Sequence, residues 1–167
     1  GGFGEVRIGK HDTPAKLATS GLDAFGDGYG AMEHIIAADG HRVNNAVAYI
    51  TKAGPVGLAV AHSTDPLSND AAASSTTAAN TAMANYSNGP IYAGLGYTAI
   101  DNLGTDINLG LGYKHEAGHF ANVVYETVEG DVATTANTTD TAAFPRGTAT
   151  DTNIYVAGGF KTGAATL

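Results

Sequence analysis

The sequence has no cysteine and no tryptophan, and only 14% of its 167 residues are charged. Without cysteine the chain can form neither a disulfide nor a thiolate metal site. Charged residues make up about a quarter of a typical soluble domain, so this chain is unusually poor in charge. No stretch approaches the roughly 18–20 consecutive apolar residues that a transmembrane helix needs. Membrane-spanning β-strands are still possible, because the hydropathy of an alternating strand averages to a value near zero.

The charge that is present is mainly negative, with a formal net charge of −8. Lys and Arg are scattered, so the basic surface patch of a nucleic-acid-binding protein is missing and no nucleic-acid partner is expected. The N-terminal stretch GGFGEVRIGK shows no charged region followed by an apolar core. We therefore expect Gly1 to begin inside a larger protein or after processing.

The strongest pattern is an alternation of apolar with small or polar residues. In Ile91–Thr98 and in Ile107–Lys114, every second residue is apolar and the others are mostly Gly, Asn, Thr or Lys. Successive side chains of a strand point to opposite faces, so both segments are predicted to be strands. Similar segments are Phe3–Ile8, Arg42–Ile50, Leu58–Val60, Ala82–Tyr86, Ala121–Glu126 and Ile154–Lys161. This pattern predicts an all-β fold of about eight antiparallel strands, and it groups Val43 with Val47 and Tyr49 on one face.

The predicted connections alternate between short and long. The short ones contain Gly and Pro or Asn-Gly turn residues: Ala53–Pro55, Ser87–Pro90 and Glu116–Gly118. The long ones are Thr13–Gly40, Asp65–Thr81 and Asp131–Thr152, with the shorter Asp101–Thr105 on the same side. Short turns at one end and long loops at the other are typical of an outer-membrane β-barrel, and a soluble sandwich would not show them so regularly.

The two faces of the predicted strands differ in the way that lipid outside and water inside would require. One face is apolar, while the other carries Gly, Asn, Thr, Glu, Lys and Arg. Five tyrosines end apolar faces and suggest an interfacial belt: Tyr49, Tyr86, Tyr97, Tyr113 and Tyr125. The alternative is that tyrosine is simply a favourable strand residue.

The stretch His115-Glu116-Ala117-Gly118-His119 fits the zinc signature H-E-x-x-H. The signature works on a helix, where residues four apart share a face. Here it falls between two predicted strands and contains Gly118, a turn residue. We therefore interpret it as a turn, with no metal site, cofactor or catalytic residue set in the chain.

Five segments resemble the general, non-specific porins of Gram-negative bacteria: GGFGEVRIGKHDTP, LDAFGDGYG, HRVNNAVAYIT, YSNGPIYAGLGY and INLGLGYKHE. The resemblance covers nearly the whole chain, 1–167, as one internal portion of a barrel. It implies a transmembrane antiparallel β-barrel of about 16 strands, of which about eight are present here. It also implies an outer-membrane homotrimer that contacts lipid and lipopolysaccharide.

The resemblance further implies that the loop 13–40 folds into the barrel and narrows the pore. Its expected carboxylates are those of Asp23, Asp27 and Glu33. The expected basic residues of the facing wall are Lys10, Arg42 and, by alternation alone, Arg7. Opposed charges across water create a transverse field, and with the net charge this arrangement favours a mild preference for cations. Alternatively, Asp23 and Asp27 only shape Asx turns.

The interpretation that these observations favour is a porin for passive diffusion of ions and small hydrophilic solutes, and not an enzyme. The alternatives are a small non-conducting barrel or surface β-protein for anchoring or adhesion, a secreted β-sandwich and, least favoured, a zinc enzyme. Strands flanking this segment would distinguish a large barrel from the first two.

Overall fold

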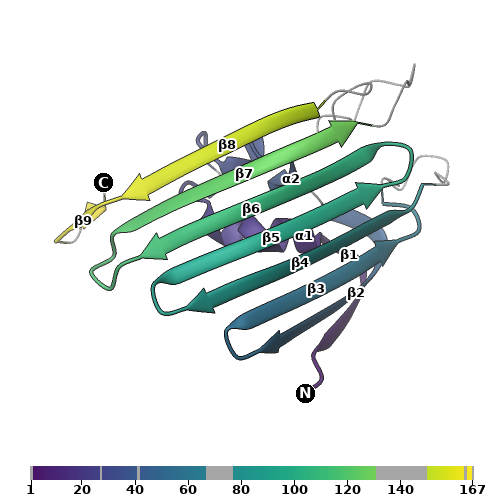
Figure 1. The fold of residues 1–167 in the computed structure, drawn as a ribbon, viewed down its shortest axis with the longest axis horizontal. Coiled ribbons are helices and arrows are strands. Elements are labelled where there is room, and N and C mark those ends of the chain that lie inside the picture. Colours follow the sequence, from purple (N-terminus) through teal and green to yellow (C-terminus); the bar gives the residue numbers. More distant parts are fainter. Residues whose placement is uncertain are drawn as a thin grey trace.

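Eight antiparallel strands follow one another in sequence order across a single curved sheet (Figure 1). The computed structural model describes residues 2–26, 28–40, 42–66, 77–130, 150–163 and 165–166. The strands are β1 (Glu5–Asp12), β2 (Arg42–Ala53), β3 (Val56–Ser63), β4 (Ala79–Asn88), β5 (Ile91–Ile100), β6 (Gly104–Lys114), β7 (Phe120–Gly130) and β8 (Thr150–Gly159). The all-β prediction is confirmed, and each predicted strand corresponds to one of these.

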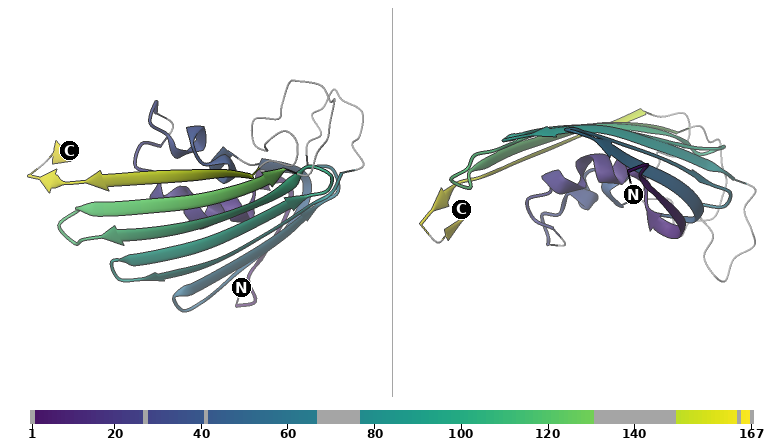
Figure 2. Two further views of the ribbon diagram at one scale, coloured as in Figure 1. Left: turned by 45° about the horizontal axis from the view of Figure 1, so that its top comes forward. Right: turned by 90° about the horizontal axis from the view of Figure 1, so that it is seen from below.

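Four short helical elements lie on the concave side of the sheet (Figure 2). They are α1 (Pro14–Thr19), η1 (Ser20–Leu22), η2 (Met32–His34) and α2 (Ala37–Gly40), all between β1 and β2. We call this side the loop face and the opposite side the open face. Beyond β8, the short strands β9 (Lys161–Thr162) and β10 (Ala165–Thr166) pair with each other. Within the described ranges, no helix combines the length and the apolar character that crossing a membrane requires.

The connections alternate as the sequence predicts. Two-residue turns join β2 to β3 and β4 to β5, with Gly54 and Gly89 at positive φ. Glycine adopts this left-handed backbone without a steric penalty, which is why these tight turns contain it. At the other end of the sheet, β1 to β2, β3 to β4 and β7 to β8 are joined by much longer segments. The predicted connection Asp131–Thr152 falls largely outside the described residues.

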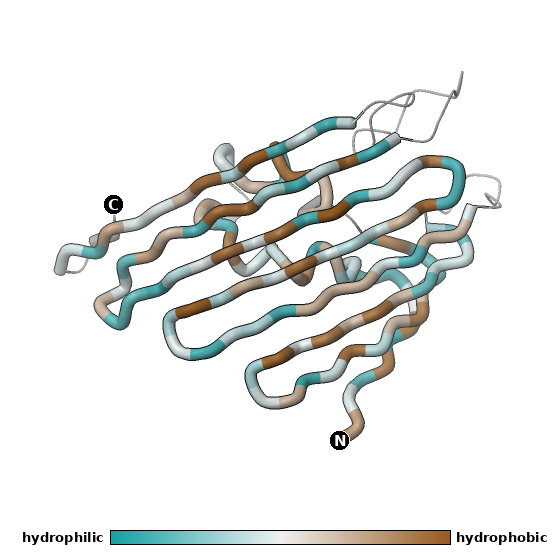
Figure 3. The backbone as a smooth tube through the Cα atoms, viewed as in Figure 1, coloured by the Kyte–Doolittle hydropathy of each residue, from teal (hydrophilic) through white to brown (hydrophobic). Residues whose placement is uncertain are grey.

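Burial alternates along the strands and separates the two faces. In β3, for example, every second residue is exposed and the others are buried. Most of the exposed residues of this set are apolar, and they lie on the open face: Ile8 is 81% exposed and Val156 is 73% exposed. Figure 3 shows the same alternation of hydrophobic and hydrophilic residues along neighbouring strands. The sheet therefore presents a continuous apolar surface on the side away from the helices.

One predicted side-chain grouping is wrong. Val43 does not share the exposed face of Val47, because it is only 3% exposed whereas Val47 is 52% exposed. The register of β1 and β2 shifts here: Gly9 pairs with Ala46, but His11 pairs with Val43. Between these two pairs, β1 advances by two residues and β2 by three, so β2 contains a bulge. The extra residue reverses which side chains face inward, and Val43 therefore lies on the loop face.

The H-E-x-x-H stretch forms the turn between β6 and β7. The His115 N–H donates to the His119 carbonyl over 2.8 Å, and the Gly118 N–H donates to the His115 carbonyl over 2.8 Å. The two imidazoles stack with their centroids 5.8 Å apart. The predicted turn is thus confirmed for this stretch, in place of the helix on which the H-E-x-x-H signature works.

Candidate functional site

The segment 13–40 begins as a capped helix set directly on the sheet. Thr13 accepts a hydrogen bond from the Lys16 N–H over 3.1 Å, and Pro14 occupies the first helical turn. Both features favour a helix start. Ala15 and Ala18 are fully buried, and α1 packs against β4, β5 and β6. Small residues thus allow α1 to lie close to the strands.

A floor of glycines on β5 and β6 makes this close approach possible. A side chain at Gly96 would place its Cβ 2.8 Å from the Ala15 Cα, and one at Gly110 would lie 2.5 Å from Leu22 Cδ1. Gly94 and Gly110 are directly paired across the two strands. The loop face is therefore hollowed where α1 and η1 rest on it, and a larger residue would have to displace them.

Polar side chains of the loop face hold the backbone of α1 and η1. Tyr92 donates to the Ala18 carbonyl over 2.7 Å, and Asn122 donates to the Leu22 carbonyl over 2.8 Å. Asn108 donates to the Ala15 carbonyl over 3.1 Å. Ala18 and Leu22 lie at the C-terminal ends of α1 and η1, where carbonyls have no partner within the helix, so two of these bonds satisfy otherwise unpaired carbonyls. The polar face of the sheet is thus a docking surface as well as a wall.

The second helix, α2, is held by a single carboxylate. Glu126 on β7 is fully buried and accepts from the N–H groups of Ala37 over 2.8 Å and of Ala38 over 2.7 Å. Asn153 on β8 donates to the same carboxylate over 2.9 Å. A carboxylate that receives the first N–H groups of a helix acts as its N-terminal cap. Glu126 therefore links α2 to two strands of the sheet.

A second buried acid lies beside this cap. Asp106 on β6 is fully buried, its carboxylate interacts with that of Glu126, and neither of its side-chain oxygens has a hydrogen-bond partner. Two charged carboxylates buried side by side would be costly, since each takes the other's place as a counter-charge or donor. Asp106 therefore places a second acid directly under the segment that the surface holds.

Asp23, the first of the predicted constriction carboxylates, is part of the segment's own framework. It accepts from the Phe25 N–H over 2.9 Å, from the Met32 N–H over 3.2 Å and from the Tyr155 hydroxyl over 3.2 Å. The first of these bonds closes an Asx turn. Asp23 is only partly buried, so its charge still faces the space beside the loop.

The other predicted site residues are spread along the chain. Glu33 is exposed in η2, and Asp27 lies outside the described residues. Arg7 is exposed on the loop face and pairs with Glu5 over 2.7 Å, while Lys10 is exposed on β1 opposite the bulge of β2. The described hydrogen bonds and ion pairs join none of the predicted acids to a predicted base. Their role in a constriction therefore stays a prediction.

Arg42 has a partner that sequence analysis did not single out. Its guanidinium lies 3.2 Å from the carboxylate of Asp12, which also lies 3.7 Å from the Lys16 ammonium. Asp12 ends β1 and Arg42 begins β2, so the pair joins the two points at which the segment leaves and re-enters the sheet. All three side chains are partly exposed, and each pair stabilises the structure by less than about 1 kcal/mol.

Sequence analysis also missed the residues that bind the segment. Glu126, Asn108 and Asn122 all belong to the predicted polar faces of their strands, and Gly94 and Gly110 to the predicted small faces. The strand register could have grouped these residues, because their positions become neighbours once β5, β6 and β7 pair. Their partners, however, are backbone groups of a distant segment, which alternation within one strand does not indicate.

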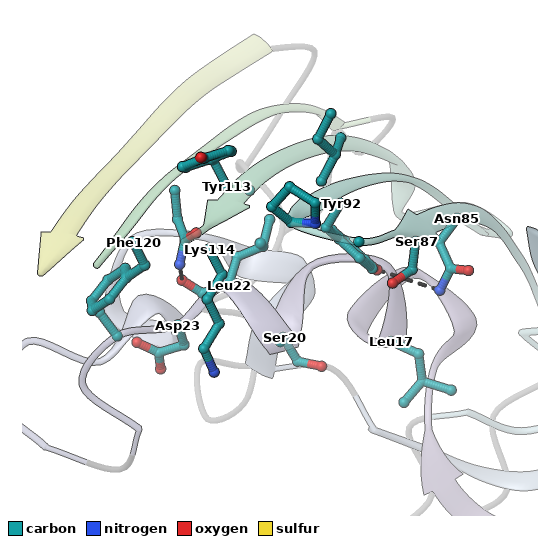
Figure 4. A pocket seen from close by; sticks show the side chains of 17 residues that line it. Leu17, Ser20, Leu22, Asp23, Asn85, Ser87, Tyr92, Tyr113, Lys114 and Phe120 are labelled. Carbon is teal, nitrogen blue, oxygen red and sulfur yellow. Dashed lines mark hydrogen bonds between the residues drawn. The ribbon is translucent and has the colours of Figure 1, made fainter. Parts of the chain in front are cut away.

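A cavity of about 650 Å³ opens between the segment and the end of the sheet that carries the short turns (Figure 4). Leu17 and residues 20–24 of the segment form one side of it, and strands β4 to β7 with the turn between β4 and β5 form the other. Its lining is mixed, with Asp23 and Lys114 among the aromatic rings of Tyr92 and Phe120. The docked segment thus leaves a water-accessible recess against the wall and does not fill it.

Taken together, the geometry is a curved antiparallel sheet with an apolar outer surface and a long segment pinned to its polar inner surface. No curated protein matches this sequence. The model of one family, described as Gram-negative porin, matches residues 1–167. Because that match spans the whole chain, and agrees with the strand order and the two faces, the chain belongs to the Gram-negative porin family.

Proposed function

We propose that this porin forms a water-filled channel for passive diffusion of ions and small hydrophilic solutes across the outer membrane of a Gram-negative bacterium. The observation that carries the proposal is the docking of the segment 13–40 on the polar face of the sheet, through bonds such as that from Tyr92 to the Ala18 carbonyl. When the barrel closes, a segment on this side narrows the water-filled interior. It then acts as a size and charge filter.

The apolar open face supports the membrane location. Ile91, Leu95, Leu109 and Leu111 are each about half exposed, and they stand on neighbouring strands. Such a surface would be unfavourable in water, whereas the hydrocarbon of a bilayer solvates it. Paired strands also satisfy their backbone hydrogen bonds internally, as lipid requires. Lipid and lipopolysaccharide are therefore the proposed neighbours of this face, and a homotrimer is the proposed assembly.

The proposed transport needs no chemical step. Solutes cross by diffusion through water, and the side chains along the passage set only size and charge preference. The groups that most suggest chemistry have structural roles, since Glu126 caps α2 and His115 and His119 belong to a turn. The proposal accordingly assigns no enzymatic activity and no cofactor.

Single-channel recording of the intact protein in a planar bilayer tests this function. We expect large ohmic conductance steps that close in groups of three, because each subunit of a trimer contains its own pore. Correctly folded protein that gives no steps would contradict the channel and would favour the rival function, anchoring or adhesion by a non-conducting barrel.

Reversal potentials in a salt gradient measure the ion preference of the same channels. We expect a mild preference for cations, since the net charge is −8 and both arginines of the predicted wall are neutralised by ion pairs. A clear preference for anions would show that the charge lining the passage differs from that proposed.

A further inference from the structure

The cavity beside the segment carries one charge of each sign. Asp23 reaches it from the segment, and Lys114 reaches it from the end of β6 (Figure 4). The two groups lie about 90 residues apart in sequence and line one cavity because η1 docks beside β6 and β7. The cavity therefore brings together two charges that would otherwise be remote from each other.

Neither charge is neutralised by a protein ion pair within the described part of the chain. The ion pairs there involve Glu5, Arg7, Asp12, Lys16 and Arg42, and they include neither Asp23 nor Lys114. The Asp23 carboxylate is held in place by N–H and hydroxyl donors, which fix its position but leave its negative charge. A fixed carboxylate and a free ammonium thus line the same recess.

The remaining lining offers apolar surface of defined orientation. Leu22 is buried against Gly110 and Gly112, and the Tyr92 ring is held by the bond from its hydroxyl to the Ala18 carbonyl. The ring of Phe120 lies at the start of β7 beside the same cavity. A volume of about 650 Å³ falls in the range of small-molecule sites. The recess can therefore hold a small apolar group between its charges.

We propose that this cavity is a binding subsite for a small zwitterionic solute with an apolar side group, the chemistry of an apolar α-amino acid. The solute's ammonium group lies toward Asp23, its carboxylate toward Lys114, and its side group against Leu22, Tyr92 and Phe120. The subsite rests on the proposed channel function, since it names a class of solute that the channel passes. The subsite lies between the segment and strands β4 to β7, at the end of the sheet that carries the short turns. It is therefore distinct from the predicted basic wall on β1 and β2.

A solute with only one charge fits this lining less well. A plain carboxylate would satisfy Lys114 and leave Asp23 facing its apolar body, while a plain amine would do the reverse. Each charge-assisted hydrogen bond contributes roughly 1.5–3 kcal/mol, which corresponds to about tenfold or more in affinity. The two charges of a zwitterion therefore give selectivity as well as binding.

Calorimetric titration of L-phenylalanine into the intact protein in detergent tests the subsite. We expect 3-phenylpropionate, which lacks the ammonium group, and 2-phenylethylamine, which lacks the carboxylate, to bind about tenfold or more weakly than L-phenylalanine. The substitution Lys114→Met should weaken L-phenylalanine by a similar factor and leave 2-phenylethylamine nearly unchanged. Lys52→Met is the matched control, because Lys52 is an exposed lysine of β2 outside the cavity.

The outcomes separate this inference from the channel function. Equal binding of all three compounds, equal loss in both lysine variants, or no binding of L-phenylalanine would each overturn the subsite. Single-channel recording on the same preparations is independent of these titrations. Normal conductance without binding leaves the channel standing and removes only the subsite, whereas selective binding without conductance removes the channel and leaves a binding protein.

Discussion

Replacing Glu126 with alanine is expected to release the segment 13–40 from the sheet. The substitution leaves the N–H groups of Ala37 and Ala38 and the Asn153 amide without their common acceptor. Buried donors that lose their partner cost about 1–3 kcal/mol each, so α2 should detach and not stay in place unsatisfied. We expect a higher single-channel conductance with more current noise, and rapid cleavage between 13 and 40 in limited proteolysis.

Two further substitutions sharpen this result. Glu129→Ala removes an exposed carboxylate from the same strand and should change neither conductance nor cleavage. Asp106→Asn replaces the second buried acid with an uncharged amide that can donate to Glu126, so the segment should be at least as resistant to cleavage as in the wild type. If Glu126→Ala behaved like Glu129→Ala, the carboxylate would not be what holds α2.

The second large effect is expected from Gly96→Val. Valine is a better strand residue than glycine, so in an isolated sheet this change would be stabilising. Here the Cβ of the new side chain would lie 2.8 Å from the Ala15 Cα, which is a backbone atom and cannot rotate away. We expect α1 to be displaced, at a cost of about 1–3 kcal/mol or more, while the sheet itself stays folded.

The measurement for Gly96→Val pairs thermal unfolding with single-channel conductance. Gly158→Val on β8 is the control, because a Cβ at Gly158 has only an ordinary contact at 3.5 Å and this residue is exposed. We expect the control to unfold at or above the wild-type temperature with unchanged conductance. A Gly96→Val channel identical to the wild type would mean that α1 does not rest on the glycine floor in the membrane.

The sheet could be predicted from sequence because its determinants are local. Alternation within a strand such as Ile107–Lys114 depends on residues two apart, and a turn such as Gly54-Pro55 depends on its own backbone preferences. Local rules failed where a neighbouring strand decides the geometry. Val43 turned inward because β1 opposes β2 with one residue fewer, and the sequence of β2 alone does not contain that information.

The docking of the segment could be predicted only in outline. That 13–40 enters the barrel was implied by family resemblance, but the groups that hold it are side chains of β4 to β8 bonded to main chain of the segment. Every residue except proline has a backbone N–H and carbonyl group, so the residue types do not predict that Glu126 accepts from Ala37. The predicted acids and bases were chosen for their charge, whereas uncharged Asn108, Asn122 and Tyr92 make much of the attachment.

The order of assembly follows from how far apart these partners are in the chain. The hydroxyl of Tyr155 receives the N–H of Ala24 across 131 residues, and Glu126 receives that of Ala38 across 88. Strands joined by short turns, such as β2 with β3 and β4 with β5, can pair early, whereas contacts of such separation must first overcome a larger loss of chain entropy. We therefore expect the segment to settle on the sheet only after β7 and β8 have paired. During folding, the proposed passage would then be wider than in the native protein until the segment docks.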